Sequence, residues 1–299
     1  MSSDGPAQSS VVVSVNDVEL ACLTSPSIDD ESLPLAFCLH GFPDSAHTWR
    51  LLMPRLEEAG FRVVAPFLRG YAPSSVPADG RYQIGAPALD VIGLHDYFGG
   101  DGNAVIIGHD WGAPITYTAA SFEPDRWAKV VGMAVPPGAA FAASFLTSTD
   151  QLKKSWYMFF FQSGLADLVV PSNDLAFIDM LWNDWSPGYD AAADLALLKP
   201  SLRDPANLTA ALGYYRAALG DGYVDPALGD IQSKAQDVPP QPLLYLHGMN
   251  DGGIGSEVAE SARSMVTDNV TIEIIDGTGH FLHLEAPDVV NQRIVEFVS

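Results

Sequence analysis

Basic residues are scarce in this chain. Its 299 residues include 15 Lys and Arg against 37 Asp and Glu, which gives a formal net charge of −22 at pH 7. A surface with this surplus of negative charge repels phosphate groups, which argues against a nucleic acid or an anionic membrane as the partner. The charge says little about a substrate, because a distributed surface charge does not reveal the polarity of a pocket.

Cysteines and long apolar runs are also few. Cys22 and Cys38 are the two cysteines, and both fall in predicted strands, so we expect two reduced core thiols rather than a disulfide. The first ten residues contain neither a basic segment nor an apolar core, so no signal peptide is visible. The most apolar long stretch, 130–146, is broken by Pro136 and Pro137 and is too short to span a membrane. A cytoplasmic location is the default expectation.

The pattern of apolar residues predicts an α/β fold. Strands and helices alternate along the chain, which is typical of a mainly parallel sheet covered by helices on both faces. Residues 11–15 and 18–23 form a predicted hairpin, and residues 1–10 a frayed tail. The remaining predicted strands are 35–39, 61–65, 104–107, 127–135, 243–246 and 270–275. The predicted helices lie near 45–59, 84–98 and 256–265 and begin at 113 and 287.

The alternation stops in the middle of the chain. Between Pro136 and Gln236 the sequence shows helical patterns interrupted by Pro, Gly and Asp, and no convincing strand. We therefore expect residues 1–136 and 237–299 to form one core domain. Residues 137–236 form a predicted helical cap, inserted after the strand at 127–135.

The segment Gly108-His109-Asp110-Trp111-Gly112 connects a buried strand to a helix. Small residues on both sides of a central residue are typical of the sharp turn that carries the nucleophile in hydrolases. The usual central residue is Ser, whereas here it is Asp110. A carboxylate needs no deprotonation before it attacks a saturated carbon and forms an ester. The segment therefore suggests a hydrolase of strained rings or alkyl halides.

Three further loops follow predicted strands at the same edge of the sheet, where ligands bind in such folds. The first is His40-Gly41-Phe42-Pro43, whose backbone can aim the Phe42 N–H at a point near Asp110. The other two contain Asp251 and His280. The order nucleophile, acid, histidine is that of α/β-hydrolases. The N–H groups of Phe42 and Trp111 are the predicted oxyanion hole.

Taken together, these motifs resemble those of the α/β-hydrolase-fold epoxide hydrolases over nearly the whole chain after residue 11. The resemblance implies an α/β-hydrolase fold and conversion of an epoxide to a vicinal diol. At Phe67 and Ala72 the sequence differs from that of many relatives. Both positions belong to a supporting loop and do not change the predicted catalytic residues. The matching pieces are His40-Gly41-Phe42-Pro43, Arg69-Gly70-Tyr71, Gly108-His109-Asp110-Trp111-Gly112, Asp251, and Gly279-His280-Phe281 with Glu285 and Pro287.

Two tyrosines of the predicted cap complete the resemblance. Tyr157 matches a family tyrosine that shortly precedes a Phe-Gln pair, and Tyr215 matches one that directly precedes an Arg. Helical spacing also favours Tyr215, which shares an apolar stripe with Leu208 and Leu212, whereas Tyr214 lies on a poorer face. For Tyr157 the spacing is uninformative, because the residues around it are apolar on every face of the predicted helix.

The resemblance implies a two-step mechanism. Asp110 opens the epoxide while Tyr157 and Tyr215 donate to its oxygen, and water activated by His280 then hydrolyses the ester. Asp251 orients His280. Aromatic residues would line an apolar pocket, and those expected are Trp111, Phe42, Trp156 and Phe281. We expect a small apolar epoxide and water as the partners and no cofactor, and we leave a homodimer open.

Other interpretations compete with this one. A haloalkane dehalogenase shares the Asp nucleophile and the following Trp, but its relatives usually carry Asn where Phe42 stands, and it needs no tyrosine pair. A non-catalytic ligand-binding protein would lack a catalytic residue, and none is missing. We expect no metal site, since His280 and His283 lack a third ligand at zinc-site spacing. His40, His109 and His247 are predicted to be hydrogen-bonded structural residues.

Overall fold

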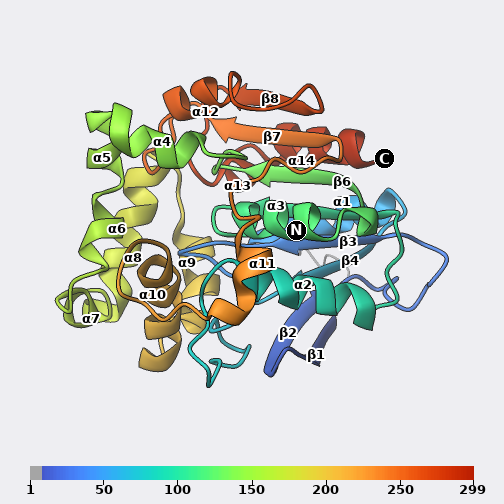
Figure 1. The fold of residues 1–299 in the computed structure, drawn as a ribbon, viewed down its shortest axis with the longest axis horizontal. Helices are drawn as coiled ribbons and strands as arrows, with labels where there is room; N and C mark the ends of the chain where they lie inside the picture. Colours follow the sequence, from blue (N-terminus) through green and yellow to red (C-terminus); the bar gives the residue numbers. More distant parts are fainter. Residues whose placement is uncertain (1–8) are drawn as a thin grey trace, which may run out of the picture.

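The computed structural model describes residues 9–299, so most of the predicted N-terminal tail lies outside the described residues. An eight-stranded sheet forms its centre, in the order β1-β2-β4-β3-β5-β6-β7-β8 (Figure 1). β2 runs antiparallel to β1 and β4, and all other neighbours are parallel. The strands are β1 (Ser9–Val15), β2 (Val18–Thr24), β3 (Leu35–Leu39), β4 (Arg62–Pro66), β5 (Ala104–His109), β6 (Trp127–Met133), β7 (Leu243–Gly248) and β8 (Val270–Ile275).

The sheet confirms the prediction of an α/β fold. Every residue of β3, β4, β5 and β7 is buried, as expected for parallel strands covered on both faces. The predicted hairpin also forms: Asn16 and Asp17, at φ of 47° and 63°, make the turn between β1 and β2. Left-handed conformations at both positions suit the twist of a two-residue hairpin turn.

Two apolar clusters separate the sheet from helices on its two faces. Along β5, Ile106 belongs to one cluster, whereas Val105 and Ile107 belong to the other, because successive side chains of a strand point to opposite faces. The first cluster includes residues of α2 (Gly85–Tyr97) and α3 (Gly112–Phe122). The second includes residues of α1 (Met53–Glu58) and α14 (Pro287–Val298).

The remaining core helices are short. α12 (Ser256–Ala262) packs against β7 and β8, and α13 (Leu282–Glu285) directly precedes α14. The helix predicted near 45–59 is divided into a 3-10 helix, Ala46–Leu51, and α1. Pro54 stands in the first turn of α1, where a missing N–H is tolerated, and so favours a new start there. Cys22 and Cys38 are both free and buried, as predicted.

Residues between β6 and β7 form helices and no strand in the described chain. We call residues 140–232 the helical segment. Residues 140–219 lie to the left of the sheet in Figure 1, at its carboxyl edge, whereas residues 229–232 pack against α2 and α3. None of the helices in residues 9–299 is long and apolar enough to cross a membrane. The segment comprises α4 (Ala140–Thr147), α5 (Thr149–Lys154), α6 (Trp156–Phe160), α7 (Ala166–Val169), α8 (Ser172–Trp185), α9 (Ala192–Leu198), α10 (Pro205–Leu219) and α11 (Gly229–Gln232).

Candidate active site

Asp110 occupies the sharp turn between β5 and α3. Its φ of 51° is left-handed, a conformation that is rare for a residue with a side chain and often marks a functional site. A side chain at Gly108 would overlap the carbonyl of Gly112, and one at Gly112 would overlap the carbonyl of Leu39. Close backbone approach therefore explains both glycines of the pentapeptide and holds the Asp110 carboxylate at the sheet edge.

The loop after β3 closes over the Asp110 carboxylate. The Phe42 N–H donates a hydrogen bond of 2.7 Å to Asp110 Oδ1, and any side chain at Gly41 would overlap Asp110. His40 holds this loop, because its Nδ1 lies 2.9 Å from the Gly41 carbonyl and its Nε2 accepts from the Leu68 N–H at 3.0 Å. Burial lowers the pKa of His40 to about 4, so its imidazole is neutral near pH 7.

His280 lies between two carboxylates. Its Nδ1 is 2.8 Å from Asp251 Oδ2, and its Nε2 is 3.4 Å from Asp110 Oδ2. Burial disfavours the charged imidazole, but the negative charges of Asp251 and Asp110 outweigh burial and raise the pKa of His280 to about 10. At this pKa the imidazole is protonated near pH 7, and its buried Nε2, which has no hydrogen-bond partner within the described chain, faces Asp110.

Asp251 is held in its ionised form. Burial alone would raise its pKa, but the nearby His280 imidazole and backbone donors lower that pKa below its usual value. The N–H groups of Gly253 and Ile254 donate to Oδ1 at 2.7 and 2.9 Å, which leaves Oδ2 for His280. The three residues predicted as a triad therefore meet in one place.

The end of α8 connects the loops of Asp251 and His280. The Trp185 carbonyl accepts from the N–H groups of Gly252 and His280, at 3.1 and 3.0 Å. The next side chain, Ser186, donates to Glu285 at 2.7 Å, and Glu285 in turn accepts from the Gly279 N–H at 2.7 Å. Trp185 and Ser186 could not be predicted from the sequence, because they lie in no motif and Trp185 acts through its backbone carbonyl.

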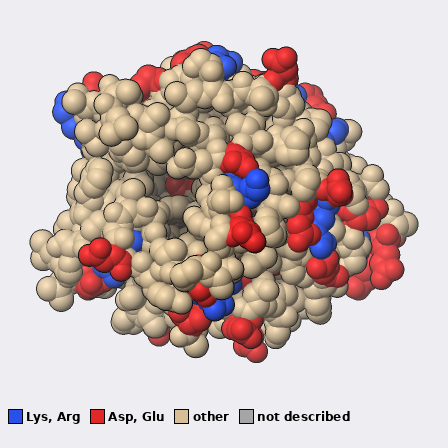
Figure 2. Space-filling view, viewed as in Figure 1, with Lys and Arg blue, Asp and Glu red and all other residues tan. Residues whose placement is uncertain are grey.

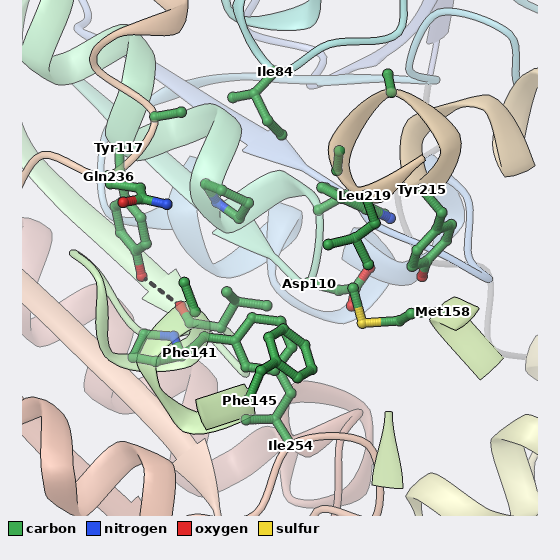
Figure 3. Close-up of a pocket in the computed structure, with 18 of the residues that line it drawn as sticks. Ile84, Asp110, Tyr117, Phe141, Phe145, Met158, Tyr215, Leu219, Gln236 and Ile254 are labelled. Carbon is green, nitrogen blue, oxygen red and sulfur yellow. Dashed lines mark hydrogen bonds between the residues drawn. The ribbon is translucent and has the colours of Figure 1, made fainter. Parts of the chain in front are cut away.

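Tyr157 and Tyr215 line the same cavity as Asp110, and Figure 3 shows Tyr215 beside Asp110. Both are buried, and their ring centroids are 5.8 Å apart in an edge-to-face arrangement. Burial is the main reason that the pKa of each phenol is well above 10, and the charge of Asp110 adds to it. Tyr215 Oη is buried without a hydrogen-bond partner in the described chain, so it is a donor available to a ligand.

Helix α10 departs from the predicted apolar stripe. Tyr214, placed on the poorer face, is as buried as Tyr215, and its hydroxyl donates to the Arg69 carbonyl at 3.0 Å. On the same side, Asn207 donates to the Gly70 carbonyl at 2.8 Å. α10 therefore packs against the core loop at Arg69–Gly70 with one face and lines the cavity with the other, which a one-sided pattern does not capture.

The cavity beside Asp110 has a volume of about 280 Å³. Of the predicted wall residues, Trp111 lines it, whereas Phe42 and Phe281 are fully buried and are not among the residues that line it. The expectation for Trp156 is wrong: it is 40% exposed, because it precedes the inward-facing Tyr157 by one position, about 100° around the helix. Apolar wall residues that the sequence did not single out include Phe141, Phe145, Met158, Leu219 and Ile254.

Three histidines are hydrogen-bonded structural residues, as predicted for His40, His109 and His247. His109 Nε2 lies 2.9 Å from the His280 carbonyl and so supports the loop that carries His280. His247 lies between the Tyr245 hydroxyl, at 2.6 Å, and the Ile254 carbonyl, at 3.0 Å. Burial lowers the pKa of both imidazoles, to about 3 for His109, which keeps them neutral.

Asp44 lies near His109 and His283 in the interior, with one potential ligand atom of each within 4.8 Å of the others. Burial raises the pKa of Asp44 to about 8, so this carboxyl is mostly protonated at neutral pH. The Thr48 hydroxyl lies 2.6 Å from His283 Nε2. A neutral acid beside two neutral imidazoles avoids an unpaired buried charge.

Comparisons with known proteins agree with this geometry. A family model described as the alpha/beta hydrolase fold matches residues 34–287. Epoxide hydrolase A of Mycobacterium tuberculosis is 28% identical over 96% of both chains, and the AB hydrolase superfamily protein YfhM of Bacillus subtilis is 29% identical over 90% of this chain and 91% of its own. The crystal structure of epoxide hydrolase A from Mycobacterium thermoresistibile superposes with a TM-score of 0.77 at 26% identity, over 97% of this chain and 98% of that one.

Proposed function

Because the chain belongs to the α/β-hydrolase fold family, we propose that it is an epoxide hydrolase that forms a covalent ester on Asp110. The observation that carries the proposal is the placement of Asp110 between two kinds of proton-transfer group. His280 Nε2 lies 3.4 Å from Asp110 Oδ2, and the unpartnered hydroxyl of Tyr215 belongs to the same cavity. An Asp nucleophile, a base and a phenol pair are the groups that epoxide hydrolysis in two steps requires.

In the first step, Asp110 Oδ2 attacks an epoxide carbon from the side opposite the C–O bond. Oδ1 stays bound to the Phe42 N–H, which orients the carboxylate. The C–O bond breaks and its electrons stay on oxygen, which takes a proton from Tyr157 or Tyr215. Because their pKa values are raised, the phenols are protonated at neutral pH and available as donors, while the alkoxide is a stronger base.

In the second step, water attacks the carbonyl carbon of the Asp110 ester and gives its proton to His280. The N–H groups of Phe42 and Trp111 would stabilise the oxyanion that forms. Esterification removes the negative charge of Asp110, one of the causes of the raised His280 pKa, so the imidazole becomes a base after the first step. When the tetrahedral intermediate breaks down, His280 returns its proton to the leaving alkoxide and the vicinal diol is released. The carboxylic acid left on Asp110 gives its proton back to the tyrosinate, which regenerates the carboxylate and both phenols.

The helical segment acts as a cap in this proposal. It supplies Tyr157 from α6 and Tyr215 from α10, while the core supplies Asp110, Asp251 and His280. This division corresponds to core residues 1–136 and 237–299 and cap residues 137–236. All proposed steps use side chains and backbone N–H groups of this chain together with water.

The test is accumulation of the ester in His280→Gln. After incubation with styrene oxide, intact-protein mass spectrometry is expected to show protein carrying one added substrate. Asp110→Asn is the matched control, in which the mass stays unchanged. An unchanged mass in folded His280→Gln that still binds the substrate would contradict the covalent mechanism.

The alternative of a haloalkane dehalogenase is separated by its product. Halide release from 1-bromobutane is expected to be negligible beside diol formation from styrene oxide. Phe42 offers no side-chain donor for a halide, and its N–H is already bound to Asp110. Rapid halide release without diol formation would replace the proposed function by that alternative.

A further inference from the structure

The cavity has one reactive end and one open end. Figure 3 shows Asp110 and Tyr215 at one side of the lining residues, and Ile84 and Gln236 at the other. The exposed lining residues are Ala142, Ala218, Leu219 and Gln236, so the cavity opens to solvent between α4, α10 and residue 236. Figure 2 shows a hollow on this face of the molecule, with an acidic side chain visible inside it. A substrate that enters between these exposed residues reaches Asp110 at the buried end of the cavity.

The passage between the two ends is apolar. Phe141 and Phe145 of α4 lie along one side of it and Leu219 of α10 lies on another, with Ile254 from the core. The whole cavity, with a volume of about 280 Å³, is at the lower end for ligand pockets and has room for one alkyl chain or one aromatic ring. The passage is suited to a single hydrocarbon substituent.

Behind the reactive end, packed aromatic rings close the cavity. We call Phe42, Phe161 and Phe177 the aromatic wall; Phe42 and Phe161 are fully buried, and none of the three lines the cavity. The Phe161 ring centroid is 5.0 Å from that of Tyr215, 5.5 Å from Phe42 and 5.8 Å from Phe177. Protein interiors packed in this way do not admit another group without displacing a ring.

The loop of Phe42 is itself fixed. Trp182 donates from Nε1 to the Pro43 carbonyl at 2.8 Å, and its ring stacks on Phe281 at a centroid distance of 3.5 Å. Phe42 also donates its N–H to Asp110, so its backbone cannot move without moving the nucleophile's hydrogen bond. The closed end is therefore a rigid part of the site.

From this geometry we propose that the substrate class is terminal epoxides, with a single apolar substituent that runs from Asp110 toward Gln236. The inference rests on the proposed function and adds the substitution pattern of the substrate. Back-side attack fixes the epoxide carbon against Asp110 and the oxygen against the tyrosines. In a trans-disubstituted epoxide the two substituents point in opposite directions, so one of them would meet the aromatic wall.

The test uses two epoxides of the same composition. In 1,2-epoxyoctane all six remaining carbons extend from one epoxide carbon, whereas trans-4,5-epoxyoctane carries a propyl group on each. We expect kcat/KM for the terminal isomer to be at least about 100-fold higher, since a pocket that lacks room for a group discriminates by this order. Equal values for the two isomers would overturn the substrate class and leave the proposed function intact. Hydrolysis of neither isomer, nor of styrene oxide, would instead contradict the proposed function.

Phe161→Ala tests the aromatic wall itself. Removing this ring is expected to reduce the preference for the terminal isomer to within about tenfold, and Phe177→Ala serves the same purpose if Phe161→Ala does not fold. Phe145→Ala is the matched control, because it removes a ring of the same size from the open passage and is expected to keep the preference. A folded wall variant that hydrolyses 1,2-epoxyoctane with the preference unchanged would overturn the proposal.

Discussion

Asp110 and Tyr215 reach the same cavity by different structural routes. At the sheet edge, Asp110 is held by backbone geometry: a left-handed φ of 51°, neighbouring glycines without room for a side chain, and the Phe42 N–H. In the helical segment, Tyr215 is held by packing, with its ring against those of Phe42, Trp111 and Phe161. The comparison indicates that the position of the proposed nucleophile depends on the main chain, whereas the positions of the proposed donors depend on which rings fill the space around them.

This difference predicts unequal tolerance to substitution. A main chain at close approach cannot adjust to an added atom, but a helix can shift to relieve a crowded ring. We expect substitutions at the sheet edge to reduce mainly the free energy of unfolding. Substitutions in the helical segment should mainly change the rate of reaction and the choice of substrate.

The largest effect is expected for Gly112→Ala. The new methyl group would overlap the Leu39 carbonyl, so the variant should fail to fold or lose more than about 4 kcal/mol of unfolding free energy. Gly164→Ala, in the helical segment, is the control because no atom lies within 4 Å of the added group. Denaturant unfolding of both variants gives the comparison. A Gly112→Ala variant as stable as wild type would contradict the role given to the main chain.

The next effect is expected for the tyrosine pair. Replacing Tyr157 and Tyr215 together by Phe removes both donors but keeps both rings, so ester formation should slow by about 10²–10⁴-fold while stability changes little. Each single variant should lose less, since one phenol remains. Tyr214→Phe is the matched control, because its hydroxyl bonds to the Arg69 carbonyl away from the cavity. Single-turnover kinetics with styrene oxide measures the rate of ester formation. A double variant that forms the ester at the wild-type rate would show that the two phenols are not the proton donors.

The smallest effect is expected on the stability of the protein when either of two buried acids is replaced. These are Asp44 in the sheet-edge loop and Asp194 in the helical segment. Asp44 has a pKa raised to about 8, so its cost to folding grows as pH rises from near 4 toward 8. Asp44→Asn should therefore stabilise the protein by about 2 kcal/mol at pH 8, and by less than half of that at pH 5. Asp194 is 2.6 Å from Arg50, so Asp194→Asn should instead destabilise it by about 1 kcal/mol.

Denaturant unfolding of both variants at the two pH values measures this difference. Asp268→Asn, an exposed acid, controls for the general loss of negative charge. If Asp44→Asn were destabilising at pH 8, the hydrogen bond of 2.8 Å from the Ser45 N–H to Asp44 Oδ1 would outweigh the cost of burying the charge.

The sequence allowed the strands and the sheet-edge residues to be predicted, because both depend on local signals. Strand β5 follows from an unbroken apolar run, and Asp110 from its two flanking glycines. The helical segment was less predictable. The run around Tyr157 is apolar in all directions, so its spacing could not show that Trp156 faces outward. Tyr214 was predicted to lie on a less buried face of α10 than Tyr215, but α10 is buried on two sides and both tyrosines are covered.

Contacts between distant loops were not predictable at all. Gly252 and His280 meet the Trp185 carbonyl across long stretches of chain, and a carbonyl has the same chemistry in every residue. Asp44 likewise follows a recognisable motif, but its protonation depends on how fully the surrounding structure excludes water.

The Trp185 carbonyl has a consequence for engineering chimeras. Helix α8 ends at Trp185. The carbonyl of this residue accepts hydrogen bonds from the loop of Asp251 and from the loop of His280. A graft that replaced residues 137–236 with the corresponding segment of a relative would exchange this acceptor together with the substrate walls. Catalytic alignment would then depend on the donor segment placing its own carbonyl at the same point. Exchanging α4 and α10 alone, with α8 retained, offers a way to alter the passage while the base and its orienting acid stay anchored.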